Sequence, residues 1–137
     1  MLKDIPNFKV ENIGIAIVPK TANAAENNND LWNVYIVNLK KDAISNVLIS
    51  TEGYGEKDGK PIKTSTLRHF IEGVESKTCS LIEPIEQAVF ELTNQYWISF
   101  KLNDLTYDKK YVFVKGSIDK SNFTNIPILN ERGVLIM

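Results

Sequence analysis

The sequence predicts an all-β protein that forms a single antiparallel β-sandwich domain over residues 1–137. The first observation is a succession of about eight or nine short apolar runs, separated by residues that favour turns. The second is the absence of any long amphipathic helical pattern, so repeated β-α-β units cannot be built. The third is the length of 137 residues, which suits one domain whose core needs no disulfide bonds.

The layout of the apolar runs resembles an immunoglobulin-like β-sandwich at the level of architecture. The resemblance stops there, because Cys79 is the only cysteine and the inter-sheet disulfide of antibody domains cannot form. We expect at most one short helix, near residues 64–74.

The first predicted strand covers Phe8–Val18, where isoleucines alternate with the small residues Gly14 and Ala16. Small residues on one face predict the close approach of another backbone there. The polar segment Thr21–Asp30 follows and is predicted to be a loop that proteases cleave.

Two further runs, Leu31–Lys40 and Ile44–Ser50, flank the polar turn Lys40–Asp42. The first is apolar on both faces at its centre and is therefore predicted to be an internal strand. The second alternates, with an irregularity expected at Ile44. Together the two runs predict an antiparallel hairpin.

The segment Gly53–Pro61 is glycine-rich and is predicted to be part of a loop over residues 53–63, with a turn at Asp58–Gly59. It matches neither the dinucleotide fingerprint nor the phosphate-binding loop, because both require other glycine spacings and sequence contexts.

The segment Thr64–Val74 is ambiguous, because its apolar residues fit either helical spacing or strand alternation. We favour a strand. The next run, Lys77–Ile85, contains Pro84, which predicts an edge strand or the end of one. A short apolar run, Ala88–Leu92, leads into the segment with the strongest pattern.

That segment, Asn94–Gly116, predicts a central hairpin. In its first half Tyr96, Ile98 and Phe100 share one face, as period-two alternation requires. Its second half includes Tyr111–Val114, apolar at every position and predicted to be covered on both faces. The turn lies at Asn103–Asp104 or nearer Asp108.

Trp97 falls on the less apolar face of this hairpin. We expect it to pack under a loop or a second layer, with an exposed contact residue as the alternative. The C-terminal run, Gly133–Met137, is apolar to its end and predicts a closing strand.

The formal net charge of −1 and the pI near 5.9 argue against binding to nucleic acid or to an anionic membrane. No apolar run is long enough for a transmembrane helix. The N-terminal residues Met1–Pro6 carry an acid and a proline where a signal peptide needs an apolar stretch. We therefore expect a cytoplasmic protein.

The sequence contains no recognisable set of catalytic residues. His69 is the only histidine, and no nucleophile motif surrounds any serine. The glutamates Glu83, Glu86 and Glu91 are expected to form a solvated rim. With one histidine and one cysteine in the chain, we expect neither a zinc-type metal site nor a cofactor.

A basic cluster lies beside Tyr54 and consists of Lys57, Lys60, Lys63 and Arg68. An aromatic residue among cations suits an acidic partner. The pair Arg68–His69 has an anion site as one interpretation and an ordinary structural role as the other.

The function predicted from these observations is a non-catalytic protein-binding or assembly module, with partners or self-association at an edge strand. The alternative is a small-ligand-binding protein or enzyme. Its pocket would lie near the 53–63 loop and Arg68–His69.

Overall fold

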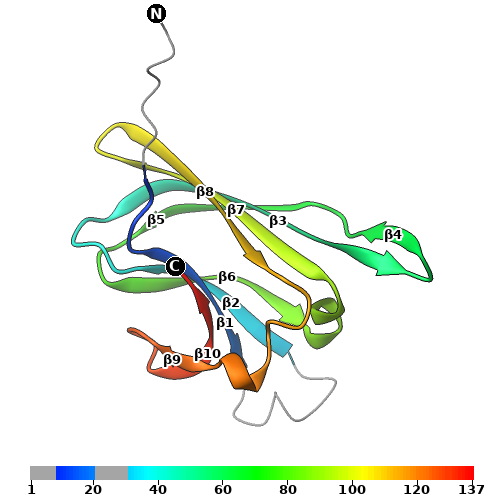
Figure 1. Cartoon of the computed structure of the whole chain (residues 1–137). Coiled ribbons are helices and arrows are strands. Elements are labelled where there is room, and N and C mark those ends of the chain that lie inside the picture. The colour runs from blue at the N-terminus through cyan, green and yellow to red at the C-terminus, as the bar shows by residue number, and fades with distance from the viewer. Residues whose placement is uncertain (1–8, 21–30) are drawn as a thin grey trace, which may run out of the picture.

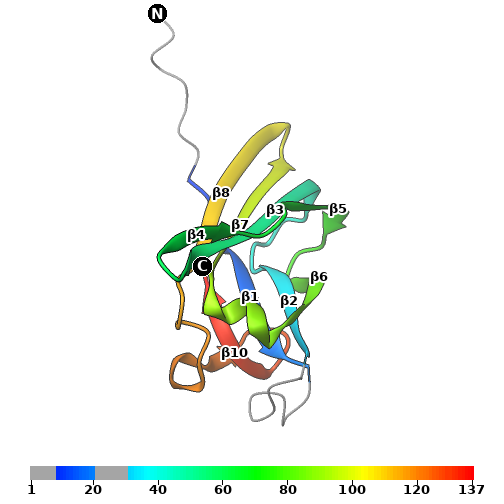
Figure 2. The ribbon, with the colours of Figure 1, turned by 90° about the vertical axis from the view of Figure 1, so that its right-hand side faces the viewer.

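The structure is a computed structural model that describes residues 9–20 and 31–137. Within this part, two antiparallel sheets pack on each other, which confirms the predicted all-β sandwich (Figures 1 and 2). The loop predicted at Thr21–Asp30, with its expected protease cleavage, lies outside the described residues.

The first sheet has the strand order β6-β2-β1-β10-β9, with bounds Thr78–Glu86, Leu31–Asn38, Ile13–Pro19, Glu131–Ile136 and Thr124–Ile126. The second has the order β4-β3-β7-β8, with bounds Lys60–Lys63, Ile44–Lys57, Thr93–Leu102 and Leu105–Phe113, and β5 (Leu67–Val74) also pairs with β3. The main core lies between the sheets and is built from inward-facing isoleucines, valines and aromatic residues.

Strand β1 is buried on both faces. Its isoleucines face the main core, while Ala16 and Val18 join a second apolar cluster on the other side. A Cβ atom at Gly14 would lie 2.8 Å from the carbonyl oxygen of Ile136 in β10. The predicted close approach of another backbone is therefore confirmed. The predicted closing strand is also confirmed, because β10 pairs with β1.

The predicted hairpin of Leu31–Lys40 with Ile44–Ser50 is wrong. Strand β2 is internal, as predicted, but it pairs with β1 and β6, whereas β3 pairs with β5 and β7 in the other sheet. The chain changes sheets at Asn38, whose side chain is fully buried. The irregularity expected near Ile44 is confirmed as a register shift between Ser45 and Leu48.

Asn38 holds this corner through four hydrogen bonds. Its Nδ2 donates to the carbonyl oxygens of Asp42, Val74 and Glu75 at 3.0, 3.1 and 3.1 Å. Its Oδ1 accepts from the backbone N–H of Lys40 at 2.9 Å. One side chain thus ties the crossing from β2 to β3 to the crossing from β5 to β6.

The predicted loop over residues 53–63 is also wrong, because these residues form a β-hairpin arm (Figure 1). Strand β3 continues to Lys57, and β4 returns beside it. The predicted turn at Asp58–Gly59 is confirmed, since both residues have positive φ, 54° and 77°. That conformation suits a two-residue hairpin turn. The turn brings β4 back beside the glycine-rich end of β3, so the two segments pair although glycine has a low β propensity.

The ambiguous segment Thr64–Val74 contains strand β5 and no helix, so the favoured interpretation is confirmed. The two short 3₁₀ turns of the described chain lie elsewhere, at Gln87–Glu91 (η3) and Lys120–Asn122 (η4). In η3, Phe90 packs edge-on against Trp32, with ring centroids 4.9 Å apart. Strand β6, which contains Pro84, is an edge strand as predicted.

The central hairpin is confirmed as β7 and β8. Tyr96, Ile98 and Phe100 are buried, and Asn103 and Asp104 form the turn with φ of 53° and 64°. The prediction that Tyr111–Val114 is covered on both faces is wrong, and β8 is the last strand of its sheet. Its residue Val112 is only partly buried, and Val114 just beyond it is 58% exposed.

Trp97 is 48% exposed, so its predicted packing under a loop or second layer is wrong. The alternative, an exposed residue, agrees with the structure. The reason is positional: Trp97 points away from the core on the face that no other described strand or turn covers.

Two buried tyrosines connect the sheets. The Tyr111 hydroxyl on β8 donates to the carbonyl oxygen of Ile13 on β1 at 2.6 Å. The Tyr96 hydroxyl on β7 donates to Glu83 Oε2 on β6 at 3.1 Å. Burial raises the pKa of both phenols, and for Tyr96 the charge of Glu83 and the hydrogen bond to it raise the pKa further.

These pKa shifts predict that stability is lost in alkali. Both folded-state pKa values exceed the ordinary value of about 10, so the stability is fully present below that pH. Above it, the unfolded chain releases protons that the folded chain retains. Each tyrosine then lowers the free energy of unfolding by about 1.4 kcal/mol per pH unit. Urea unfolding of Tyr111→Phe should show a shallower alkaline decline than the parent, whereas exposed Tyr54→Phe should not. Equal slopes in all three proteins would contradict the prediction.

Cys79 lies half-buried beside the second apolar cluster, and its Sγ is 3.8 Å from the carbonyl oxygen of Pro127. Burial raises the pKa of this thiol, which lowers the thiolate fraction at neutral pH. We therefore expect a chromogenic disulfide reagent to modify native Cys79 slowly and the denatured chain quickly. Rapid labelling of the native protein would show instead that Cys79 is a reactive thiol.

Candidate functional site

The six predicted binding residues do not form one site. Tyr54 lies opposite Lys63, and Lys57 lies opposite Lys60, across the β3–β4 arm. Lys60 and Lys63 are three residues apart, so they point to opposite faces of their strand. Lys63 is also neutralised, because its Nζ lies 3.4 Å from Glu52 Oε2. The structure therefore divides the predicted basic cluster.

Arg68 and His69 are likewise separated, because adjacent residues of a strand point to opposite faces. Arg68 lies on the outer face of the second sheet, in register with Ser50. His69 points inward, where its Nε2 lies 2.7 Å from Glu83 Oε1 on β6. The two side chains therefore lie on opposite faces of β5, and the structural role for His69 agrees with the contact to Glu83.

The outer face of the second sheet carries an exposed apolar patch of three residues, here called the Trp97 patch: Leu48, Phe70 and Trp97. Their exposed fractions are 55%, 58% and 48%. Leu48 and Phe70 are cross-strand partners on β3 and β5, and Trp97 lies on the neighbouring strand β7. No other described strand or turn covers this face.

Charged residues of both signs surround the Trp97 patch. Arg68 is beside it on β5, and Lys110 on β8 places its Nζ 5.8 Å from the centroid of the Trp97 ring. Asp108 lies next to Lys110 on the same face of β8, in register with Ser99. The patch is therefore an apolar centre with a polar, charged rim.

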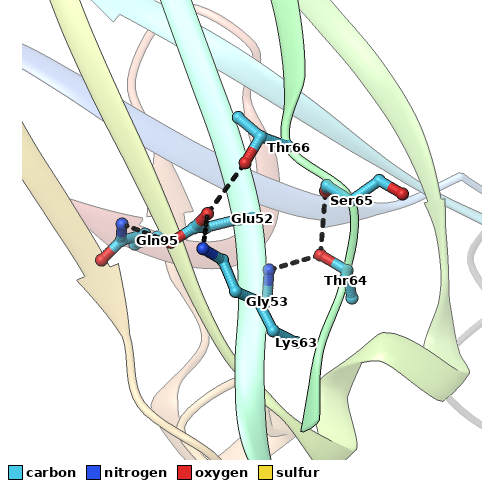
Figure 3. A network of polar contacts seen from close by, with 7 residues as sticks. All are labelled: Glu52, Gly53, Lys63, Thr64, Ser65, Thr66 and Gln95. Carbon is cyan, nitrogen blue, oxygen red and sulfur yellow. Dashed lines mark hydrogen bonds and ion pairs between the residues drawn. The ribbon is translucent and has the colours of Figure 1, made fainter.

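A polar network borders the patch on the side of the β3–β4 arm (Figure 3). At its centre is Glu52, whose Oε2 accepts from Thr66 Oγ1 at 2.9 Å and whose Oε1 accepts from Gln95 Nε2 at 3.2 Å. Close by, Thr64 Oγ1 accepts from the backbone N–H of Gly53 at 2.7 Å. These bonds hold the surface in one shape, and a hollow of about 290 Å³ lies between this network and Trp97.

A second concave feature opens between the sheets where the edge strands β5 and β6 face each other. It is a cavity of about 310 Å³, with three glutamates, several hydroxyl and amide groups, and apolar side chains in its lining. One of the glutamates, Glu83, is buried and held by both His69 and Tyr96. The predicted solvated rim is therefore wrong for Glu83, although Glu86 and Glu91 are exposed.

Sequence reasoning missed Leu48 and Phe70 as surface residues. The signal for Leu48 was present, because it sits between Val47 and Ile49, and a strand that buries both must turn Leu48 outward. Phe70 could be placed on the surface only if Thr64–Val74 was taken as a strand, because helical spacing would have put its side chain in the core.

Within the described residues, no helix has the length and apolarity that crossing a membrane would require. A scan against protein-family models finds no match for this chain, and a search of curated proteins finds no similar sequence.

Proposed function

We propose that this protein is a non-catalytic protein-binding or assembly module and that its contact surface is the outer face of the second sheet. The observation that carries the proposal is the Trp97 patch. Single exposed apolar residues are ordinary, but a contiguous apolar patch with a polar rim is typical of interaction sites.

The composition of the face favours a protein as the partner. Trp and Arg are enriched among the residues that dominate binding energies, and Trp97 and Arg68 lie in one cross-strand row. The rim carries both signs of charge, so we expect no nucleic acid to bind. An immunoglobulin-like strand arrangement, a cytoplasmic location and partner addition at an edge strand stay predictions.

Site-specific photo-cross-linking tests the proposal. A photoreactive amino acid replaces Lys101, which is exposed on the outer face of β7, two residues from Ser99. In cells that natively make the protein, we expect a discrete adduct from this position. The same probe at exposed Lys115, beyond the end of β8, is the matched control and should give none. Absence of an adduct at Lys101, or equal adducts at both positions, would contradict the proposal.

A second candidate function, binding of a small ligand, is favoured by the cavity between β5 and β6. Three of its lining residues are carboxylates, and none is a lysine or arginine. Such a lining suits a cationic or hydroxyl-rich small molecule. Native mass spectrometry of the purified protein should then detect a bound molecule. Ser65→Trp, at the cavity lining, should exclude this molecule, whereas Ser121→Trp, at an exposed position outside the lining, should not.

A further inference from the structure

We infer that the partner on the outer face is a second copy of this chain, an inference that rests on the proposed function. Two neighbouring rows of side chains run across strands β5, β3, β7 and β8 on this face. Here they are called the Asp108 row and the Lys110 row. The first consists of Phe70, Leu48, Ser99 and Asp108, and the second of Arg68, Ser50, Trp97 and Lys110.

The two rows are complementary to each other strand by strand. On β8 one row holds Asp108 and the other Lys110, which are opposite charges. On β3 and β7 a large apolar residue in one row corresponds to a serine in the other: Leu48 to Ser50, and Trp97 to Ser99. Along a strand the rows are two residues apart, about 7 Å.

A two-fold axis can bring these complements together. The axis lies in the interface plane, perpendicular to the strands and midway between the rows. It places each strand over its own copy and the Asp108 row over the Lys110 row of the second copy. Such an interface is isologous, so every contact occurs twice. The small inter-sheet angle that sheet twist imposes leaves these two central rows in closest contact.

Four kinds of contact follow from this arrangement, each formed twice. Asp108 meets Lys110 of the second copy as an ion pair. Phe70 meets Arg68, whose guanidinium can lie on the aromatic ring. Leu48 enters the space above Ser50, and Trp97 enters the space above Ser99. Large residues therefore face small ones, as close packing of two sheet faces requires.

The other in-plane two-fold axis, parallel to the strands, is disfavoured by the charges. It places β5 over β8 of the second copy, so that Arg68 faces Lys110 and the apolar ring of Phe70 faces Asp108. Like charges across an interface suppress the pairing. The charge pattern thus selects one of the two symmetric arrangements.

The dimensions of the face indicate a weak, concentration-dependent dimer. Four strands about 4.8 Å apart and four rows about 7 Å apart cover roughly 540 Å². A standard stable interface buries about 800 Å² per partner. The protein should therefore exchange between monomer and dimer.

Sedimentation velocity across loading concentrations from about 1 μM to about 1 mM tests the inference. The parent should shift from monomer towards dimer. Lys110→Asp and Asp108→Lys each place like charges across the axis. Each should lower the association constant at least tenfold, roughly the effect that one close charge pair has on association. The double exchange, Asp108→Lys with Lys110→Asp, restores opposite charges and should return it to within about threefold of the parent. Lys115→Asp is the charge-matched control off the face and should associate like the parent.

Each result separates this inference from the proposal on which it rests. A monomeric parent at every concentration, or a double exchange that stays as weak as the single variants, overturns the inference. If the Lys101 probe then cross-links a different protein, the outer face is still a binding surface and only the identity of the partner is wrong. If it cross-links nothing, both fail. A Lys101 adduct of twice the chain mass, together with rescue by the double exchange, supports both.

Discussion

Phe100→Ala is expected to lower the free energy of unfolding by about 3–5 kcal/mol, the usual cost of removing a buried aromatic side chain. Phe100 is 1% exposed and belongs to the core between the sheets. Its ring stacks on that of Tyr107, with centroids 5.3 Å apart and an interplanar angle of 9°. Alanine would leave a cavity that two sheets joined by cross-sheet hydrogen bonds cannot close easily. Urea denaturation at equilibrium measures the loss.

The neighbouring change, Lys101→Ala, is the matched control, because this side chain is exposed on the opposite face of the same strand. It should alter the free energy of unfolding by no more than about 0.5 kcal/mol. If Lys101→Ala proved the costlier change, the register of β7 would be displaced by one residue and its faces exchanged.

Asn38→Ala is expected to lower the free energy of unfolding by about 2–4 kcal/mol, because it removes four hydrogen bonds to buried or partly buried backbone groups. The carboxamide satisfies three carbonyl oxygens and one N–H where the chain passes between the sheets. Alanine has nothing to replace these bonds, and water can reach the fully buried site only if the corner opens. The same denaturation experiment measures the effect.

Asn33→Ala serves as the control, since Asn33 lies on the same strand at a partly exposed position. We expect it to cost less than about 1 kcal/mol. Equal losses for the two asparagine variants would mean that the corner is held by the packing around it rather than by the Asn38 hydrogen bonds.

Local features of the fold could be predicted from the sequence because they depend on neighbouring residues. Alternation placed Tyr96, Ile98 and Phe100 in the core, and the residues at 58–59 and 103–104 marked their turns. Assignment of strands to sheets could not be predicted in this way. The carbonyl groups that hold Asn38 at the corner include Val74 and Glu75, 36 and 37 residues along the chain.

The candidate site was harder to predict than the fold. The residues of the outer face come from four strands, and they meet only through pairings across the sheet. Grouping by sequence proximity instead joined Arg68 to His69, which the strand geometry separates. It also left Glu83 in a solvated rim, because the two side chains that hold it come from β5 and β7.

The β3–β4 arm has a practical consequence. Every residue of β4 is exposed, and a Cβ atom at Gly59 would have no neighbour within 4 Å. Exposed hairpin tips of this kind are where foreign segments are best tolerated. A short affinity peptide inserted between Asp58 and Gly59 would therefore give a handle for attaching the protein to a sensor surface, with the Trp97 patch left open to whatever flows past it.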